Sequence, residues 1–244
     1  MGSFEYHAGE SVLHIEVLAD AELVAKEAAG VIAQEAWLAV AARGRFIMAV
    51  SGGHTPWAML RALAAEQMPW DRVHVFQVDE RVAPAGDPDR NLTHLRESLL
   101  EHAQLPTRHI HAMPVEAFDL DTAAGRYELA LHRVAGSPPV LDLVHLGLGS
   151  DGHIASLVPG DPVLDIVDRD VALTGIYEGR RRMTLTYPII NRSRLVLWVV
   201  TGAEKVDVLN RLRDSDPTIP AGHVRGENSL LLADAAAARQ LASR

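Results

Sequence analysis

The chain has 244 residues, and its 23 basic and 32 acidic side chains give a formal net charge of −9 with histidine neutral. That charge argues against a nucleic-acid binder, because sequence-independent affinity for phosphate backbones comes mainly from clustered Lys and Arg. Apolar residues make up 48% of the chain, which suffices for a buried core, and Cys is absent. Disulfides, thiolate metal sites and cysteine nucleophiles are therefore excluded.

No stretch approaches the roughly 20 consecutive apolar residues that a membrane-spanning helix needs. The longest strong apolar run is the segment from Leu195 to Val200. The segment from Met1 to Glu10 carries acidic residues and no apolar core, unlike a secretory signal or an Arg-rich transit peptide. We expect a cytoplasmic protein that does not bind a membrane.

Helical and strand patterns alternate along the chain. Apolar residues at helical spacing predict a helix over 19–42, which Gly44 ends, and the nearly all-apolar run 45–50 predicts a strand covered on both faces. The same patterns predict further strands over 73–78, around 110, over 141–146 and 195–200, and one or two within 171–186. They predict further helices over 56–66, 92–104, 123–135, 204–213 and 234–241.

This order predicts an α/β fold with an open, largely parallel sheet and helices on both of its faces. The sequence contains no internal repeat, low-complexity tract or linker, so the simplest expectation is one domain over residues 1–244. In open sheets of this kind, ligands bind beyond the carboxyl ends of the strands. The loops that follow Val50, Val78, Leu146 and Val200 are therefore the places to seek chemistry.

The first loop, 51–56, reads Ser-Gly-Gly-His-Thr-Pro. Its two glycines allow a tight turn, and Thr55 and Pro56 are predicted as the N-cap and first residue of the next helix. Successive N–H groups at a helix start bind anions, so the loop is either a phosphate or carboxylate site or an ordinary turn. The candidate residues are Ser51, Gly52, Gly53, His54 and Thr55.

The second loop places three charged residues, Asp79, Glu80 and Arg81, directly after a buried strand, and Asn91 opens the next helix. Carboxylates at the end of a strand are suited to acid–base work, and a guanidinium offers paired donors to a phosphate. The alternative is that Arg81 only neutralises the two acids.

The third loop begins Gly-Leu-Gly-Ser-Asp-Gly-His at 147–153, a match to the GxGxxG pattern. We reject a dinucleotide site because the Pro-Gly pair at 159–160 ends the following helix after about six residues. A serine-hydrolase elbow needs glycine where Leu148 stands. The remaining candidates are Asp151 and His153, which we expect on a tight loop at a helix N-terminus, where a neutral histidine is favoured as a base.

The fourth loop ends at Lys205, one of only two lysines in a chain that otherwise uses arginine; the other is Lys26. An ammonium and a guanidinium are not interchangeable at a tight anion site. A lysine at this strand end therefore points to an anion contact.

Together, these four loops resemble the 6-phosphogluconolactonase family, in the same order along the chain. The family's Ser-Gly-Gly-x-Thr-Pro, Asp-Glu-Arg and Gly-x-Gly-x-Asp-Gly-His-x-Ala-Ser-Leu segments occur at 51–56, 79–81 and 147–157. Its Arg-x-Thr stretch begins at Arg182, and its Gly-x-x-Lys stretch ends at Lys205. The resemblance implies the fold shared with sugar-phosphate isomerases and amino-sugar deaminases, and hydrolysis of 6-phospho-D-glucono-1,5-lactone to 6-phosphogluconate in the pentose phosphate pathway.

Glucosamine-6-phosphate deaminases are the alternative. They follow Asp-Gly-His-Ile-Ala with Phe-Asn-Glu-Pro, which places a carboxylate where this chain has Val158, and they lack an arginine at the position of Arg81. Both differences favour the lactonase. The chain also departs from the usual lactonase pattern at Arg90, Val158 and the Gly222-His223 pair.

The resemblance assigns His153 as the general base that activates water, with Asp151 orienting it, and an activated ester requires no metal, cofactor or covalent intermediate. The phosphate is expected on the N–H groups of the first loop, opposite Arg81 and Lys205. The expected substrate-binding set also includes Asp79, Asn91 and Arg182. The expected partner is a small-molecule phosphorylated sugar lactone, and the sequence leaves the oligomeric state open.

Overall fold

The computed structural model of the chain describes residues 13–241. Seven of its strands form one sheet in the order β1-β10-β9-β6-β2-β3-β5, and every neighbouring pair is parallel. These strands are β1 (His14–Leu18), β2 (Phe46–Val50), β3 (Val73–Gln77), β5 (Ile110–His111), β6 (Leu143–Leu146), β9 (Val196–Val200) and β10 (Ser229–Asp234). The predicted parallel sheet is confirmed, whereas the expectation for residues 1–10 lies outside the described residues.

Helices connect most of the strands. The α-helices are α1 (Ala21–Arg43), α2 (His54–Ala64), α3 (Asn91–Leu95), α4 (Leu120–Ala135), α5 (Tyr187–Arg192) and α6 (Val206–Arg213). The other helical segments are the π-helix η2 (Arg96–Leu100), which continues α3, and the 3₁₀ turns η1 (Trp70–Arg72), η3 (Thr107–His109), η4 (Pro162–Asp165), η5 (Ala203–Lys205) and η6 (Pro220–His223). Within residues 13–241, no helix combines the length and the hydropathy needed to cross a membrane.

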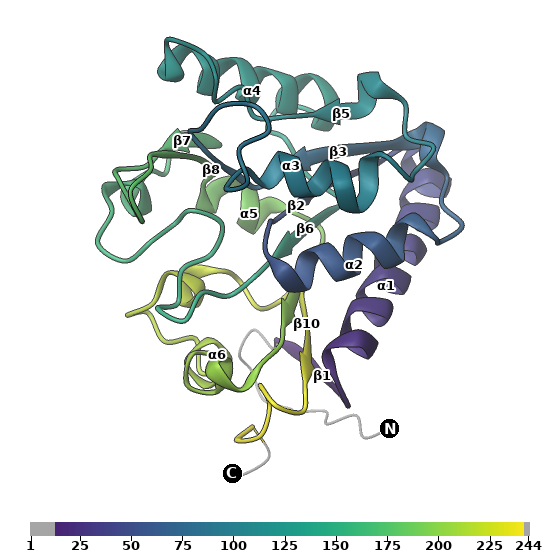
Figure 1. Cartoon of the computed structure of the whole chain (residues 1–244), viewed down its shortest axis with the longest axis vertical. Helices are drawn as coiled ribbons and strands as arrows, with labels where there is room; N and C mark the ends of the chain where they lie inside the picture. The colour runs from purple at the N-terminus through teal and green to yellow at the C-terminus, as the bar shows by residue number, and fades with distance from the viewer. Residues whose placement is uncertain (1–12, 242–244) are drawn as a thin grey trace.

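Helices cover both faces of the seven-stranded sheet, as its fully buried central strands require. On β2, Phe46 and Met48 pack with the buried side chains of α1 and α2, whereas Ile47 and Ala49 pack with those of α4, α5 and α6. Figure 1 shows α1 and α2 side by side, away from α4. Because both faces are occupied, the strand ends are the part of the sheet that remains open to a ligand.

A second, antiparallel sheet joins β4 (Asp79–Arg81), β8 (Arg182–Leu185) and β7 (Val171–Leu173). Val78 links the two sheets, because its N–H donates to the Val50 carbonyl at 3.1 Å and its own carbonyl accepts the Leu185 N–H at 2.7 Å. The Asp-Glu-Arg segment is thus a strand and not the expected loop. Its backbone pairs with a distant segment, which no local pattern signals.

The sequence patterns miss β1, β10 and α5, and the helix expected over 234–241 is a series of turns. Asp234 does accept the N–H of Ala237 at 2.8 Å, as an N-cap would, but the same carboxylate also accepts the N–H of Gly202 at 3.1 Å. The apolar run 230–233 suits a strand or a buried helix equally, and pairing with β9 and β1 decides between them. The single domain over 1–244 stays a prediction.

Three histidines crowd the β3–β5 edge of the sheet. His74 Nδ1 lies 3.1 Å from His111 Nε2, and the ring centroids of His74 and His109 are 4.0 Å apart. Burial, with added repulsion from neighbouring histidines, lowers the pKa of both His74 and His111 to about 4. The folded protein therefore keeps these two imidazoles neutral at pH values where an unfolded histidine, with a pKa of about 6.5, gains a proton.

We expect this cluster to make the protein sensitive to acid. Because the two pKa values are depressed in the folded state, their contribution to stability is complete above about pH 6.5 and is lost as the pH falls toward 4. When the pH is lowered from about 7 to about 4.5, the Tm of His74→Gln, measured by circular dichroism, should fall less than the Tm of the parent protein. The exposed His102 provides the control, and His102→Gln should show the parental loss. Equal losses in all three proteins contradict the account.

Candidate active site

The parallel sheet brings the four predicted loops together at the carboxyl ends of its strands. Thr55 Oγ1 in the first loop lies 2.7 Å from Thr201 Oγ1 in the fourth. Ser156 Oγ in the third donates to Asp79 Oδ2 in the second at 2.7 Å. Residues far apart in the sequence therefore lie along one edge of the sheet.

The buried Asp79 carboxylate is fully engaged in holding two of these loops. Its Oδ1 accepts the side-chain amide of Asn91 at 3.1 Å, its backbone carbonyl accepts the same amide at 3.0 Å, and its Oδ2 accepts the Ser156 hydroxyl. Only 4% of Asp79 is exposed. A charge at this depth is stable because each oxygen has a donor.

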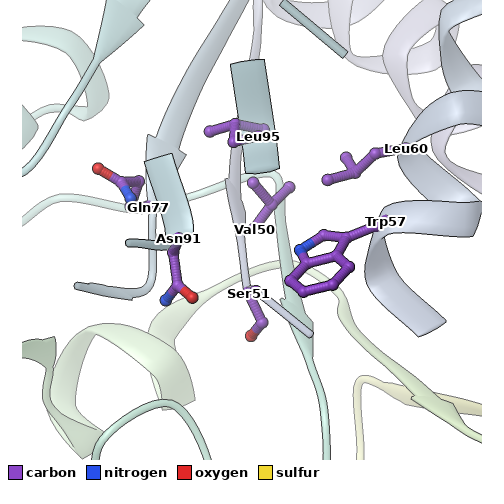
Figure 2. A pocket seen from close by; sticks show the side chains of 8 residues that line it. Val50, Ser51, Trp57, Leu60, Gln77, Asn91 and Leu95 are labelled. Carbon is purple, nitrogen blue, oxygen red and sulfur yellow. The ribbon is translucent and has the colours of Figure 1, made fainter. Parts of the chain in front are cut away.

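Asn91 also connects the first loop to Arg81. Arg81 Nη1 donates to Asn91 Oδ1 at 2.6 Å. A Cβ atom on Gly52 would lie 2.0 Å from the same oxygen, so this close approach requires glycine. Figure 2 shows Ser51, Trp57 and Asn91 around a small pocket at the end of β2. The first two loops thus share one packed contact.

Glu80 is buried, and the sequence offers it either acid–base work or neutralisation by Arg81. Its Oε1 accepts the N–H groups of Arg81 and Asn91 and its Oε2 that of Leu92, each at 2.8 Å, so the carboxylate caps the start of α3. Its ion-pair partner is Arg90, whose Nε lies 3.1 Å from Oε2. Among residues 13–241, no carboxylate pairs with the Arg81 guanidinium. The alternative that Arg81 only neutralises Asp79 and Glu80 is therefore wrong.

The first loop leads into α2, whose N-cap is Gly53 and not the predicted Thr55. Gly53 has a φ of 117°, a conformation that favours glycine, and no side chain caps the helix. Thr55 instead contacts Thr201, and the His54 ring packs edge-on against Trp57. The first N–H groups of α2 therefore remain available to an anion.

Ser51 is tied to the buried His145 of β6. The Ser51 hydroxyl donates to the His145 carbonyl at 2.9 Å, and the Ser51 N–H donates to His145 Nδ1 at 3.3 Å. Burial lowers the pKa of His145 to about 3, so its ring is a neutral acceptor. The hydroxyl proton of Ser51 is therefore committed to the protein's own backbone.

Asp151 and His153 form a hydrogen-bonded pair in the third loop. His153 Nδ1 lies 2.6 Å from Asp151 Oδ1, which also accepts the His153 backbone N–H at 3.1 Å. Because a carboxylate only accepts, the pair favours the ring proton on Nδ1 and leaves the lone pair on Nε2. Burial acts to raise the pKa of the Asp151 carboxyl, but the bonds to His153 hold that pKa below its usual value. A histidine with a free Nε2 lone pair and a carboxylate on Nδ1 is chemically suited to general-base work.

Two glycines make room for this pair. A Cβ atom on Gly149 would lie 2.1 Å from His153 Nδ1. One on Gly152, where φ is +85°, would lie 2.5 Å from Ile219 Cβ. The pattern Gly-x-x-Gly therefore serves the placement of the imidazole and the packing of the loop, and not the binding of a dinucleotide.

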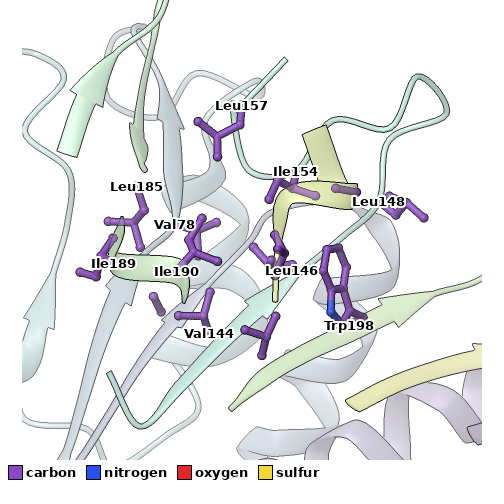
Figure 3. Packing of buried hydrophobic residues seen from close by; sticks show 14 of the residues in the cluster. Val78, Val144, Leu146, Leu148, Ile154, Leu157, Leu185, Ile189, Ile190 and Trp198 are labelled. Atoms are coloured by element: carbon purple, nitrogen blue, oxygen red, sulfur yellow. The ribbon is translucent and has the colours of Figure 1, made fainter. Parts of the chain in front are cut away.

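The helix expected after this turn does not form. Ile154 and Leu157 pair as an isolated bridge instead. Figure 3 shows their side chains in the apolar cluster that includes Leu146, Leu148 and Trp198. Buried apolar contacts, and not a helix start, fix the loop that carries Asp151 and His153.

The two remaining predicted cations lie in different surroundings. Arg182 of β8 is 3% exposed; its Nη2 pairs with Glu178 Oε2 at 2.7 Å, and its Cζ lies 4.8 Å from the ring centroid of Tyr177. Lys205 ends η5 beyond β9, and its side chain has no hydrogen bond or ion pair with another described residue.

The Tyr177 hydroxyl donates to Asp151 Oδ2 at 3.1 Å. No sequence motif signals this tyrosine.

One set of metal-ligating side chains comes together in the described part of the chain: Glu128, His132 and Asp170. These residues lie on α4 and just before β7, outside the four loops. Arg192 pairs with one oxygen of Asp170, and His132 Nε2 lies 3.4 Å from the other. The protein's own groups therefore satisfy this cluster.

Three residues that depart from the lactonase pattern, Arg90, Val158 and Gly222, lie in closely packed surroundings. Arg90 is 2% exposed and also pairs with Glu116 at 2.8 Å. Val158 is buried, which suits an apolar side chain. A Cβ atom on Gly222 would lie 2.0 Å from the Asp216 carbonyl oxygen, so this position requires glycine.

The chain matches one family of known proteins along most of its length. The family model described as glucosamine-6-phosphate isomerases/6-phosphogluconolactonase matches residues 19–232, and the chain belongs to this family. A 6-phosphogluconolactonase from Mycobacterium tuberculosis is 39% identical over 243 residues, covering 94% of this chain and 98% of the relative. A solved 6-phosphogluconolactonase from Thermotoga maritima has a TM-score of 0.79 at 28% identity and covers 90% of this chain and 98% of that one. A monomeric glucosamine-6-phosphate deaminase, with a TM-score of 0.80 at 18% identity over 92% of this chain and 98% of that one, shares the fold.

Gly149→Ala should turn the His153 ring away from Asp151, because the added methyl group would lie only 2.1 Å from Nδ1. The matched control is Gly147→Ala in the same loop, where a Cβ atom meets nothing within 4 Å. In ¹H NMR, the parent protein and the control should show the imidazole N–H proton that the carboxylate shifts downfield, and Gly149→Ala should lose it. Retention of that resonance in a folded Gly149→Ala protein contradicts the packing described.

Proposed function

We propose that this chain is a 6-phosphogluconolactonase, which hydrolyses 6-phospho-D-glucono-1,5-lactone to 6-phospho-D-gluconate in the oxidative pentose phosphate pathway. The observation that carries the proposal is the Asp151–His153 pair, which lies at the same edge of the sheet as the uncapped start of α2. The two 6-phosphogluconolactonases named above match this chain over 90% or more of its length and support the same activity.

His153 is the general base of the proposed reaction. Its Nε2 takes a proton from a water molecule as the water oxygen bonds to the lactone carbonyl carbon, and Asp151 stabilises the imidazolium that forms. When the tetrahedral intermediate collapses, the bond from C1 to the ring oxygen breaks and His153 returns the proton to that oxygen. The protein forms no covalent bond to the substrate, because the lactone is already an activated ester.

The phosphate rests on the first N–H groups of α2 in the proposed complex. Gly52, Gly53, His54 and Thr55 supply this part of the site. Lys205, which has no partner among the described residues, and Arg81 contribute opposing charge. Three of the predicted residues act by holding the loops, because their polar atoms are bonded to the protein: Ser51, Asp79 and Asn91. Arg182 adds positive charge beside Tyr177.

The alternative activity is deamination of glucosamine-6-phosphate. Val158 is buried and apolar where deaminases place a carboxylate, so a member of their ring-opening proton relay is missing. Assays of ammonia release from glucosamine-6-phosphate and of acid release from freshly made 6-phosphogluconolactone separate the two. We expect turnover of the lactone alone; ammonia release without lactone hydrolysis overturns the proposal.

His153→Ala should lower kcat by at least about 10²-fold, the usual loss for a missing general base. The rate of spontaneous lactone hydrolysis is subtracted in each assay. His102→Ala, which removes an exposed imidazole outside the four loops, serves as the control and should keep the parental kcat. A His153→Ala variant that retains near-parental kcat removes His153 from the mechanism.

Lys205→Ala should raise KM about tenfold with little change in kcat, because a contact to the distant phosphate stabilises substrate and transition state alike. Lys26→Ala is the matched control, since the only other lysine lies exposed on α1 in an ion pair with Glu22. Arg81→Ala should raise KM as well. Unchanged KM values in both Lys205→Ala and Arg81→Ala place the phosphate elsewhere.

A further inference from the structure

Tyr177 contacts both members of the Asp151–His153 pair. Its hydroxyl lies 3.1 Å from Asp151 Oδ2, while Asp151 Oδ1 is bonded to His153 Nδ1. Its ring meets the His153 ring edge-on, with centroids 5.6 Å apart and an interplanar angle of 65°. Burial and the nearby Asp151 carboxylate raise the pKa of the Tyr177 hydroxyl, so this hydroxyl stays protonated and is the donor.

The surroundings of Tyr177 hold its ring in place. Tyr177 and Arg180 exchange backbone hydrogen bonds of 3.0 and 3.2 Å across a turn in which Glu178 and Gly179 both have positive φ. The Arg182 guanidinium lies over the ring face, and Glu178 pairs with the same guanidinium. The orientation of Tyr177 is therefore built into the connection between β7 and β8.

We propose that Tyr177 is a positioning residue, which locks the Asp151 carboxylate and thereby holds the His153 ring in the orientation that proton transfer needs. This inference rests on the proposed function and names a further residue of the same site. A carboxylate bonded through one oxygen rotates easily about its last side-chain torsion, because that torsion has broad minima. A second bond, from Tyr177 to Oδ2, removes this freedom.

The same hydrogen bond reduces the negative charge of Asp151 beside His153. The charged and titratable groups around Tyr177 are Asp151, His153, Glu178 and Arg182. By donating to Asp151, the hydroxyl withdraws part of the negative charge that stabilises the imidazolium. Its loss should leave a more basic carboxylate, so the acid limb of the pH–rate profile should move to higher pH.

Tyr177→Phe tests the proposal, because it removes the hydroxyl and keeps the ring. We expect kcat to fall about tenfold, KM to stay within about twofold, and the acid limb of kcat to move up by roughly half a pH unit. The control is Tyr187→Phe, which removes a hydroxyl that donates to the Pro220 carbonyl at 2.9 Å and does not contact Asp151. It should keep the parental kcat and pH profile.

Three results overturn the proposal. The first is a parental kcat and pH profile in Tyr177→Phe. The second is an equal loss in Tyr187→Phe, which indicates a general structural effect. The third is a rise in KM without a change in kcat, which makes Tyr177 a substrate contact instead.

Failure of the proposed function is recognised separately, because the unmodified protein would then not hydrolyse the lactone. The downfield His153 N–H proton still tests the positioning role in that case. In Tyr177→Phe this resonance should broaden or shift relative to the unmodified protein and to Tyr187→Phe. An unchanged resonance overturns the positioning role whatever the substrate is.

Discussion

The buried Asp79 carboxylate joins the second and third loops directly, and its partner Asn91 packs against the first. Its two oxygens accept Asn91 and Ser156, and Asn91 in turn meets Gly52 and accepts from Arg81. Removing a charge from water is costly unless donors replace the lost hydration, so this carboxylate is stable only when the loops are in place. The parallel sheet brings the strand ends together, and this one set of hydrogen bonds sets how the loops meet there.

Charge is distributed unevenly around that framework. A net charge of −9 repels a sugar phosphate at long range, so attraction has to be local. In the proposed complex this attraction comes from the uncapped N–H groups of α2, Lys205 and Arg81, while Arg90 and Arg182 already pair with carboxylates. The negative Asp151 is neutralised in part by its bonds to His153 and Tyr177. In the proposed function, the phosphate and the proton transfer therefore occupy separate parts of the site.

The sequence predicts the helices and strands whose apolar spacing is strong, such as α1, β2 and β9, and it predicts which loops meet. It misses β1, β10 and β4, because each depends on pairing with a distant segment that local patterns do not encode. Within the site, the motif at 147–157 identifies Asp151 and His153. Tyr177 lies in no motif, and only the fold brings its hydroxyl to Asp151. Glu80 is visible in the triplet, yet only the structure shows that it caps α3 while Asp79 joins the loops.

The central claim is that one ligand extends from the start of α2 to His153, with its phosphate at the first and its carboxylate at the second. A crystal structure with 6-phosphogluconate tests it most directly. We expect phosphate oxygens within hydrogen-bonding distance of the N–H groups of residues 52–55, and the C1 carboxylate beside His153 Nε2. A product bound in the reverse direction, or with its phosphate away from α2, contradicts the account.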